Sequence, residues 1–587
     1  MVFEAPAWVP KVPIEIPDSI TLEEFMASEK YGRRPAAKSR NPYTCGITGR
    51  TYTAVEVIDR TRNIAKAIAK RTGWTPNEGT PWDKVVGIFS LNTIDYIPLA
   101  HAVHRLNGIV TPASAAYSAP EAEHQLRASG AKILFTCLPL LEAALAAAKN
   151  VGIPKDKIFL LDMPVPDKKT PYVPISALAE EGKSLPDLEP LQWCKGQGAR
   201  QAAFLCFSSG TSGLPKAVMI SHLNVIANVM NHAAFESHAV KLSGPETEVV
   251  LGLLPLSHIY GLVVIAHCGT YRGSEIIILP RFEMNSYLNA IEQFKIERLV
   301  VVNECATSPR VWYMPDGYDA DFCDIGKKDL SSVRVLYTGA APMGIQTLAD
   351  TQRLWPDWKI GQGYGMTETS TIICTTSEHD IFIGSSGSII PNTRGKIMGF
   401  DGKEVTTHDT PGELWAQGPS VVLGYLNNEK ANAETFVWDH DGRWIKTGDE
   451  VVVSKAPSGN EHLFIVDRIK ELIKVKGHQV APAELEAHLL AHPMVNDTAV
   501  IPVLDDHAGE VAKAFVVKAA SETEGLSDPE ICRSIAKHVE DHKAKYKWLS
   551  GGIEFIDGIP KSPSGKILRR LLRDKEKASR AKKGARL

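Results

Sequence analysis

Several features that would assign a class at once are missing from this sequence. Its 587 residues carry 65 Lys and Arg against 68 Asp and Glu, so the formal net charge is only -3. That balance gives no overall field for gathering nucleic acid, and an anionic ligand needs a local site. Hydrophobic residues make up 44% and charged residues 23%, which excludes a disordered, collagen-like or coiled-coil chain.

Cysteine motifs and a secretion signal are also missing. The nine cysteines form no CxxC pair and no Cys/His cluster at zinc-binding spacing. We expect reduced, mostly buried thiols, which suit an intracellular protein. The N-terminal MVFEAPAWVPKVP has an early acid and three prolines where a signal peptide has a basic start and an apolar run. Secretion is therefore not expected.

One apolar run has the length of a membrane span. Residues 249–271 contain no Asp, Glu, Lys or Arg, over more than the roughly 20 residues that cross a bilayer. The run is interrupted by polar and helix-breaking residues: Pro255, Ser257, His258, Gly261 and His267. We expect a buried strand and a buried helix flanking a functional loop, and no transmembrane segment.

The C-terminal tail is strongly basic. From Ile567 it runs to Ala585, Arg586 and Leu587, a small-basic-Leu triplet similar to the Ser-Lys-Leu peroxisomal address. The triplet gives the hypothesis of peroxisomal import through an import receptor. A solvated basic terminus on a cytoplasmic protein is the alternative.

Apolar runs alternate with helical patterns. The predicted strands are 85–89, 132–135, 158–161, 203–207, 276–279 and 299–302. Thr53 and Glu56 form a capping box before one helical pattern, and Ser221 is the expected N-cap of another. Continuous apolar strands separated by helices predict an α/β protein with largely parallel sheets buried on both faces.

The length implies more than one folded unit. At roughly 150 residues per domain the chain has about four domain-sized parts. Around 467–477 charged residues alternate with aliphatics, and the part that follows is large enough for its own small core. We predict a boundary at Lys470, with residues 1–469 forming one domain that divides internally and 470–587 forming a small second domain.

The segment FSSGTSGLPKAV at 207–218 is the strongest local signal. At a strand-to-helix turn, which we expect here, hydroxyls and glycines let backbone N–H groups approach an anion, and Lys216 adds a positive charge. The predicted phosphate-binding residues are Ser208, Ser209, Gly210, Thr211, Ser212, Gly213 and Lys216. The GxxxxGK[ST] pattern is absent, which removes the main support for a P-loop ATPase or kinase. A flexible Ser/Gly linker fits poorly between two apolar runs.

This loop and six further motifs resemble those of the adenylate-forming enzymes, which include acyl-CoA synthetases, 4-coumarate:CoA ligases, luciferase and peptide-synthetase adenylation domains. The motifs follow in the family's order: YTGAAP (337–342), GQGYGMTE (361–368), KTGD (446–449), VDRIKELIK (466–474), GHQVAPAELE (477–486) and PKSPSGKI (560–567). KELIK followed by GHQVAPAELE is typical of the 4-coumarate:CoA ligase and luciferase branch. The resemblance implies a large N-terminal domain of stacked, mostly parallel sheets with helices and a β-subdomain, and a small mobile α+β C-terminal domain.

The resemblance also implies the reaction. Such enzymes transfer a carboxylic acid to the α-phosphorus of ATP, which gives acyl-AMP and pyrophosphate, and a thiol then displaces AMP. The implied cofactors are ATP, Mg²⁺ and coenzyme A. Thr211 and Lys216 are assigned to the β- and γ-phosphates, Thr367 to the α-phosphate and Glu368 to Mg²⁺.

The rest of the implied ATP site follows the later motifs. Tyr364 lies against adenine, Asp449 accepts from both ribose hydroxyls, and Arg468 neighbours it. Six more positions in the ATP site are Gly339, Ala340, Ala341, Gln362, Gly363 and Gly365. Lys566 is the implied catalytic residue of adenylation, because preorganised charge on the reacting carboxylate and phosphate is typically worth about 3 kcal/mol.

Thiol transfer is assigned to the C-terminal domain. In the resembling enzymes this domain rotates about a hinge, matched here by Lys470, and brings a new loop to the acyl-AMP. The residues that match the pantetheine tunnel are Lys474, Gly477, His478 and Gln479. His478 stands where an aromatic is usual, and we expect a partly exposed histidine without a catalytic role.

The acyl pocket departs from the family pattern. The resemblance places in it His258, Tyr260, Gly261, Asn303, Gly339, Gly363 and Thr369. Asn303, Glu304 and Cys305 stand where a Pro pair is usual, and a short insertion follows at 315–326. Both departures speak against a hydroxycinnamate substrate, and we expect an aromatic or medium-chain acid.

Three alternatives differ from an acid:CoA ligase. The acyl group could be loaded onto the phosphopantetheine of a carrier protein, or acyl-AMP could be oxidised as in luciferase. The third is a binding-only relative, which intact Lys216, Glu368 and Lys566 disfavour. The expected partners are thus small molecules: a carboxylic acid, ATP and CoA, with no nucleic acid.

Overall fold

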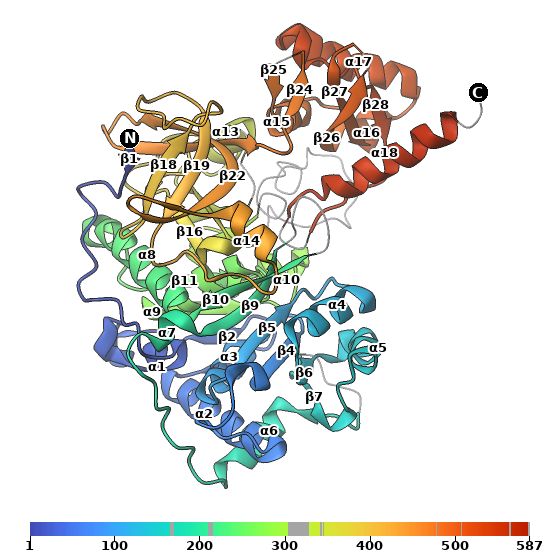
Figure 1. The fold of residues 1–587 in the computed structure, drawn as a ribbon. Coiled ribbons are helices and arrows are strands. Elements are labelled where there is room, and N and C mark those ends of the chain that lie inside the picture. The colour runs from blue at the N-terminus through green and yellow to red at the C-terminus, as the bar shows by residue number, and fades with distance from the viewer. Residues whose placement is uncertain are drawn as a thin grey trace.

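The computed structural model describes residues 1–164, 170–208, 215–302, 328–340, 343, 345–476, 478–505, 507–562 and 565–584. Within these ranges the strands form four sheets of six, eight, nine and five members. Figure 1 shows the chain running from blue N-terminal layers to an orange and red C-terminal part. In the part of the chain described, no helix is long and apolar enough to cross a membrane.

The eight-stranded sheet is mostly parallel. Its order is β20 (Gly424–Tyr425), β10 (Lys216–Ser221), β9 (Ala202–Ser208), β5 (Ile109–Ala113), β4 (Val85–Phe89), β6 (Ile133–Thr136), β7 (Ile158–Leu160) and β8 (Val173–Pro174). From β9 to β8 all neighbours are parallel. The strands predicted at 85–89, 132–135, 158–161 and 203–207 are confirmed.

The nine-stranded sheet is the second parallel layer. Its order is β17 (Ser388–Ile389), β16 (Thr371–Thr375), β15 (Lys359–Met366), β14 (Val335–Thr338), β13 (Arg298–Val301), β11 (Val249–Gly252), β12 (Glu275–Ile278), β2 (Tyr43–Cys45) and β3 (Thr51–Tyr52). The neighbours from β15 to β2 are parallel. Every residue of β13, β14 and β11 is buried, and apart from Arg298 and Thr338 none of them is polar or charged except through the tyrosine hydroxyl of Tyr337.

Helices cover both sheets and fill the space between them. Helix α2 (Ala54–Thr72) starts at the predicted Thr53–Glu56 capping box, and α8 (His222–Ser243) starts at Ser221. The run at 249–271 forms β11, a loop and the buried helix η6 (Tyr260–Cys268), as expected. Further helices are α1 (Leu22–Ala27), α3 (Tyr96–Arg105), α4 (Ala119–Ser129), α5 (Leu141–Val151), α6 (Ile175–Lys183), α7 (Gln197–Arg200), α9 (Gly269–Tyr271), α10 (Met284–Phe294), α13 (Ile345–Leu354) and α14 (Glu429–Thr435).

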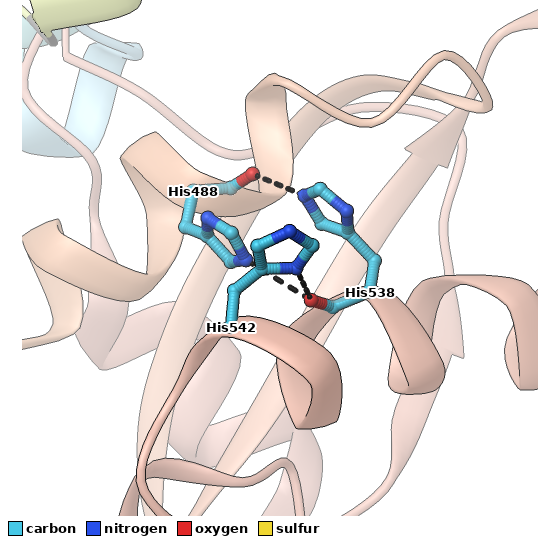
Figure 2. Close-up of side chains that lie close together, drawn as sticks. All are labelled: His488, His538 and His542. Carbon is cyan, nitrogen blue, oxygen red and sulfur yellow. Dashed lines mark hydrogen bonds between the residues drawn. The ribbon is translucent and has the colours of Figure 1, made fainter.

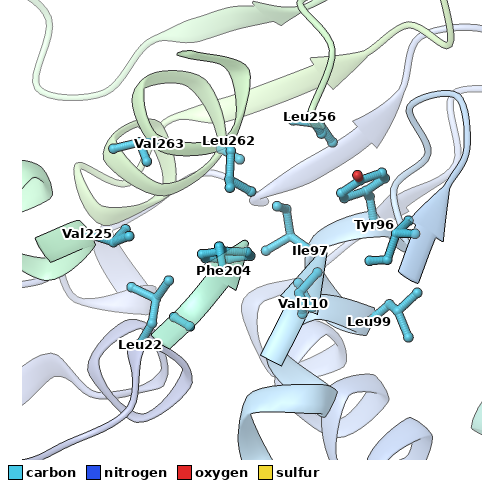
Figure 3. Close-up of a cluster of buried hydrophobic side chains, with 14 of the residues drawn as sticks. Leu22, Tyr96, Ile97, Leu99, Val110, Phe204, Val225, Leu256, Leu262 and Val263 are labelled. Atoms are coloured by element: carbon cyan, nitrogen blue, oxygen red, sulfur yellow. The ribbon is translucent and has the colours of Figure 1, made fainter. Parts of the chain in front are cut away.

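The largest core cluster joins these layers. Figure 3 shows Phe204 of β9 and Val110 of β5 facing Leu262 of η6 and Val225 of α8. All four side chains are fully buried. At roughly 1.5–3 kcal/mol for each large aliphatic or aromatic side chain buried, this cluster fixes both sheets against η6.

Two smaller sheets complete the set of sheets in the described residues. The six-stranded antiparallel sheet contains β1 (Val2–Phe3), β18 (Arg394–Met398), β19 (Gly412–Gln417), β22 (Gly442–Lys455), β21 (Phe436–Asp439) and β23 (Glu461–Arg468). The five-stranded sheet contains β25 (His478–Val480), β24 (Ile473–Val475), β27 (Gly509–Lys518), β26 (Val495–Asp505) and β28 (Ile553–Phe555). With it go the helices α15 (Pro482–Leu490), α16 (Ala520–Thr523), α17 (Asp528–His542) and α18 (Arg569–Gly584).

This arrangement confirms the predicted fold class, including a β-subdomain and an α+β C-terminal part. Lys470 lies in the turn between β23 and β24, where the chain passes from one sheet to the next. The exact domain boundary stays a prediction.

The expected strand-to-helix turn at the phosphate-binding loop is wrong. Ser208 at the end of β9 is paired with Lys216 at the start of β10, so the loop closes an antiparallel hairpin. Val218 and Ile220 are fully buried in β10, and α8 begins only at His222. A helix N-terminus therefore does not contribute to anion binding directly after this loop.

Candidate active site

The candidate site lies where parallel strands end. The carboxyl ends of β13, β14 and β15 are neighbours, and they lead into Val302, Gly339 and Thr367. Ligands of open α/β sheets bind at this edge, because the loops that follow the strands converge there. The β9–β10 hairpin of the other parallel sheet supplies Ser208 and Lys216.

Glu368 is the centre of the first group of side chains. It is buried in the short helix η8 (Thr367–Thr369), and its Oε1 accepts hydrogen bonds of 2.9 Å from Ser208 Oγ and from Tyr425 Oη. Lys216 Nζ lies 4.8 Å from the centre of the Tyr425 ring. The structure therefore brings together the predicted residues Ser208, Lys216 and Glu368, and it adds Tyr425.

Asp449 is the centre of the second group. It lies on β22 directly opposite Arg468 on β23, with Arg468 Nε 3.6 Å from Asp449 Oδ1. Tyr364 Oη donates a 2.6 Å hydrogen bond to Asp449 Oδ2. Burial raises the pKa of Asp449, and the charge of Arg468 opposes that rise. The three predicted residues thus form one contact cluster, which holds Oδ2 of the carboxylate in a fixed position.

Lys566 reaches this site from the C-terminal segment. Its backbone N–H donates to Ser562 Oγ (3.1 Å), and its carbonyl accepts from Ser562 N (2.8 Å), which closes a tight turn. Gly565 in this turn has φ +76°, and a Cβ added to it would lie 3.1 Å from Val302 Cγ2. The turn therefore packs against the carboxyl end of β13.

The charges around Lys566 belong to both groups. Burial and the positive charge of Arg468 lower the pKa of Lys566 to about 8, while Glu471, Asp449 and Glu368 act in the opposite direction. A lysine at the surface of a basic tail would show no such set of neighbours. The structure therefore places Lys566 within electrostatic range of both carboxylates assigned to ATP and its cation.

The segments around Gly339 and Gly363 are closely packed. A Cβ on Gly363 would lie 2.1 Å from Tyr337 Oη, which excludes any side chain there without movement of the tyrosine. Ala340 has φ +70°. The side chain of Gln362 is buried and accepts a 3.0 Å hydrogen bond from Met343 N. This bond ties β15 to the backbone that follows β14. The assignment of Gln362 to ATP stays a prediction.

The predicted acyl side lies next to these glycines. The ring of Tyr260 lies 3.2 Å from the position of a Gly339 Cβ, and Tyr260 is buried. His258 Nδ1 accepts a 3.3 Å hydrogen bond from Tyr260 N. Burial, with a smaller effect of Lys566, lowers the pKa of His258 to about 4, so this imidazole is neutral at pH 7.

Gly261 and Thr369 support the backbone of this region. A Cβ on Gly261 would lie 2.5 Å from the carbonyl oxygen of Pro255. Thr369 Oγ1 is used within its own turn, since it accepts from Met366 N and lies 3.1 Å from the Thr371 carbonyl oxygen. Their predicted contact with the acyl group is not tested.

The residues assigned to thiol transfer lie on the five-stranded sheet. Lys474 and Gln479 are paired across the hairpin of β24 and β25, and both are exposed. His478 is exposed and stacks on Tyr546, with ring centres 4.3 Å apart. The contacts described for this hairpin do not join it to Glu368 or Asp449. Lys470 is exposed.

Several predicted positions lie outside the described residues. They are Ser209, Gly210, Thr211, Ser212, Gly213, Asn303, Ala341, Gly477, the insertion at 315–326 and the triplet Ala585, Arg586 and Leu587.

Comparison with known proteins supplies the family. Residues 26–426 match the family model of the AMP-binding enzyme, and residues 484–566 match that of the AMP-binding enzyme C-terminal domain. The chain belongs to this family. The order of the two matches agrees with the order of the motifs and with the placement of Lys566 in the C-terminal part.

Full-length relatives of this AMP-binding enzyme are named as ligases. It is 40% identical over 578 residues to acyl-CoA ligase easD of Emericella nidulans, an alignment that covers 98% of this chain and 100% of the relative. It is 41% identical over 587 residues to acyl-CoA ligase AFT1-1 of Alternaria alternata, with 99% and 98% covered. The predicted enzyme class, an AMP-forming acyl-CoA ligase, is therefore confirmed.

Solved structures confirm the fold of the family. The anthranilate CoA ligase AuaEII in complex with anthranoyl-AMP superposes with a TM-score of 0.79 at 21% identity, covering 96% of this chain and 99% of that one. ATP-bound MatB from Rhodopseudomonas palustris superposes with a TM-score of 0.73 at 20% identity, covering 95% and 99%.

Proposed function

We propose that this enzyme converts an aromatic or medium-chain carboxylic acid, ATP and free coenzyme A into acyl-CoA, AMP and pyrophosphate. The observation that carries the proposal is the position of Lys566. A turn of the C-terminal part packs against Val302 and sets the partly buried ammonium group of Lys566 within electrostatic range of the two carboxylates Asp449 and Glu368.

In the first half-reaction an oxygen of the acid attacks the α-phosphorus of ATP, and the bond from that phosphorus to the bridging oxygen of pyrophosphate breaks. Negative charge develops between the two reactants, and the ammonium group of Lys566 stabilises it without reorganisation. Asp449, held by Tyr364 and Arg468, accepts hydrogen bonds from the ribose hydroxyls and fixes the nucleotide. His258 is neutral, so it does not compete with Lys566 for the acid.

The chemistry of Glu368 fits a magnesium ion. Mg²⁺ is usually held by one or two carboxylates together with phosphate oxygens and water. Oε1 of Glu368 accepts from two hydroxyl groups, which orients the carboxylate. An ion bound there would neutralise phosphate charge during pyrophosphate release.

The choice of acid rests on the rings beside the glycines. Tyr260 and Tyr337 are both buried and lie close to Gly339 and Gly363, respectively. Two tyrosine rings next to side-chain-free backbone suit a flat aromatic acid or an unbranched chain.

In the second half-reaction the thiol of CoA attacks the acyl carbon and AMP leaves with the pair of electrons of the acyl-oxygen bond. We assign this step to the hairpin of Lys474, His478 and Gln479 after a rotation of the C-terminal part at Lys470. The exposure of the Lys470, Lys474 and Gln479 side chains supports this assignment, because they are open to solvent in the conformation observed.

The direct test measures pyrophosphate release with ATP and Mg²⁺ over aryl, arylacetic, cinnamic and C4 to C12 fatty acids, with and without CoA. We expect CoA-dependent turnover on one class of acid. Acid-dependent formation of acyl-AMP that CoA does not discharge would overturn the choice of free CoA and favour a carrier protein.

Import into peroxisomes through Ala585, Arg586 and Leu587 stays a prediction.

A further inference from the structure

Four histidines gather on the C-terminal part, away from Glu368 and Asp449. They form two pairs with a spacing of four residues, His488 with His492 and His538 with His542. The first pair lies on α15 and just beyond its end, and the second lies on the last turn of α17. Residues four apart on a helix share a face, which is the spacing of histidine pairs that chelate metal ions on helices.

The packing of α15 on α17 brings the pairs together. Figure 2 shows the rings of His488, His538 and His542 converging between the two helices. The ring centres of His488 and His538 are 4.2 Å apart, and those of His538 and His542 are 5.1 Å apart. One ligand atom from each of the three lies within 4.8 Å of one from each of the others.

Backbone carbonyls set the tautomer of each ring. His488 Nε2 and His538 Nε2 each lie 3.2 Å from the other residue's carbonyl oxygen, and His542 Nδ1 lies 2.8 Å from the His538 carbonyl oxygen. A carbonyl only accepts, so each of these nitrogens carries the hydrogen. In the neutral form of each ring, the opposite nitrogen then carries the lone pair. Such carbonyl contacts are typical of metal-binding histidines, because they fix the tautomer and the ring.

The surroundings favour the neutral form of His488 and leave the cluster open to solvent. Burial lowers the pKa of His488, the hydrogen bond to the His538 backbone opposes that change, and the neighbouring His538 and Lys543 side chains add to it. Burial and His538 lower the pKa of His492. His488 and His538 are partly exposed and His542 is exposed, so an ion can enter from solvent. The charge of nearby Lys543 is offset by its 3.0 Å ion pair with Glu484.

We propose that His488, His538 and His542 form a site for one divalent transition-metal ion of the Zn²⁺, Ni²⁺ and Cu²⁺ class. Imidazole is a preferred ligand of these ions and a poor one for Mg²⁺, so this site is chemically separate from Glu368. Metal–nitrogen bonds of about 2.0–2.1 Å require nitrogens roughly 3.4 Å apart, so an ion would have to turn the stacked rings of His488 and His538 toward itself as it binds. The ion would join α15 to α17.

The experiment uses the full-length chain after treatment with EDTA, in excess Mg²⁺. Zn²⁺ is titrated in competition with a chromogenic chelator, and the absorption spectrum of bound Co²⁺ reports nitrogen ligation. We expect one equivalent of Zn²⁺ per chain and a higher midpoint of thermal unfolding when it is bound. His538→Gln and His542→Gln should each weaken binding at least 10-fold and abolish that shift.

Two control variants separate this site from others. His507→Gln removes an exposed histidine of the same C-terminal part, outside the cluster. His440→Gln removes the histidine of a second possible group, in which Asp439 is paired with Lys396 and Asp441 with Arg394. Both should bind like the wild type. No bound equivalent in the wild type, or unchanged affinity in His542→Gln, would overturn the proposal. His542 is exposed, so this variant is expected to fold.

Discussion

At the scale of single residues, the site is a set of charges whose positions depend on hydroxyl groups. The motifs identify Lys216, Glu368, Asp449 and Arg468, and the structure brings each of them into the same region. Tyr425 lies in none of the sequence motifs. Its contact with Glu368 depends on the pairing of β20 with β10, in which Tyr425 is the partner of Val218.

Removal of the Tyr425 hydroxyl should weaken adenylation. Tyr425→Phe keeps the ring but deletes the hydrogen bond to Glu368 Oε1, and a bond to a charged group is worth about 1.5–3 kcal/mol. We expect kcat/KM for acid-dependent pyrophosphate release to fall roughly 10- to 100-fold and the Mg²⁺ requirement to rise. Tyr172→Phe, at the far edge of the eight-stranded sheet, is the matched control. Equal rates in both variants would show that the bond does not orient Glu368.

The pKa of Lys566 should appear in the pH profile. Burial lowers this pKa to about 8, so the ammonium form is lost as pH rises through about 8. Since the charged form stabilises the reaction, kcat/KM for adenylation should fall over that range. In Lys566→Arg the group stays charged, and the fall should move to higher pH. A profile that is the same in both proteins would assign the fall to another group.

At the scale of elements, strand ends and turns decide which side chains fit. The apolar runs predicted the parallel strands correctly, because residues buried on both faces leave an unbroken hydrophobic run. The apolar runs could not predict whether the turn after β9 leads into a strand or into a helix. The run after Lys216 suits a strand or a helix, and only its pairing with β9 shows that it is β10.

Gly363 should not tolerate alanine. Its added Cβ would lie 2.1 Å from Tyr337 Oη and 2.9 Å from Tyr337 Cζ, so the ring must move. Overpacking of this kind costs typically about 1–3 kcal/mol. We expect Gly363→Ala to lower both the unfolding midpoint and the adenylation rate, and Tyr337→Phe in the same chain to restore part of both. No rescue by Tyr337→Phe would place the clash elsewhere.

At the scale of the whole molecule, long-range contacts made the predictions incomplete. The His488, His538 and His542 cluster joins two helices of the C-terminal part, and a sequence shows only the two pairs. The turn at Lys566 meets Val302, far away in sequence, through Gly565. The matched motifs implied that meeting by resemblance, but spacing alone does not show which strand end receives the turn.

Buried histidines between the two parallel sheets should make the fold sensitive to acid. His101 Nε2 lies 3.1 Å from His267 Nε2, and burial lowers the pKa of His267 to about 4 and that of the neighbouring His104 to about 3. In the unfolded chain a histidine takes up a proton near pH 6.5, whereas in the folded chain His267 and His104 take one up only near pH 3–4. Their stabilisation is therefore complete above about pH 6.5 and is lost as pH falls toward 4.

This loss can be measured by urea unfolding at pH 7.5 and pH 5. The wild type should have a lower midpoint at pH 5, with each histidine contributing up to about 1.4 kcal/mol per pH unit. His101→Gln should show a smaller difference between the two pH values, while the exposed-site variant His507→Gln should match the wild type. An equal difference in all three proteins would exclude the buried histidines as the cause.

The most direct test of the central claim, that Lys566 completes the adenylation site from the C-terminal part, compares two half-reactions in one variant. In Lys566→Ala, acyl-AMP formation from acid and ATP should fall roughly 10²- to 10³-fold or more. Thioester formation from supplied acyl-AMP and CoA should stay near the wild-type rate, and the exposed Lys577→Ala should leave both steps unchanged. An equal loss in both half-reactions, or an unchanged rate of adenylation, would contradict the account.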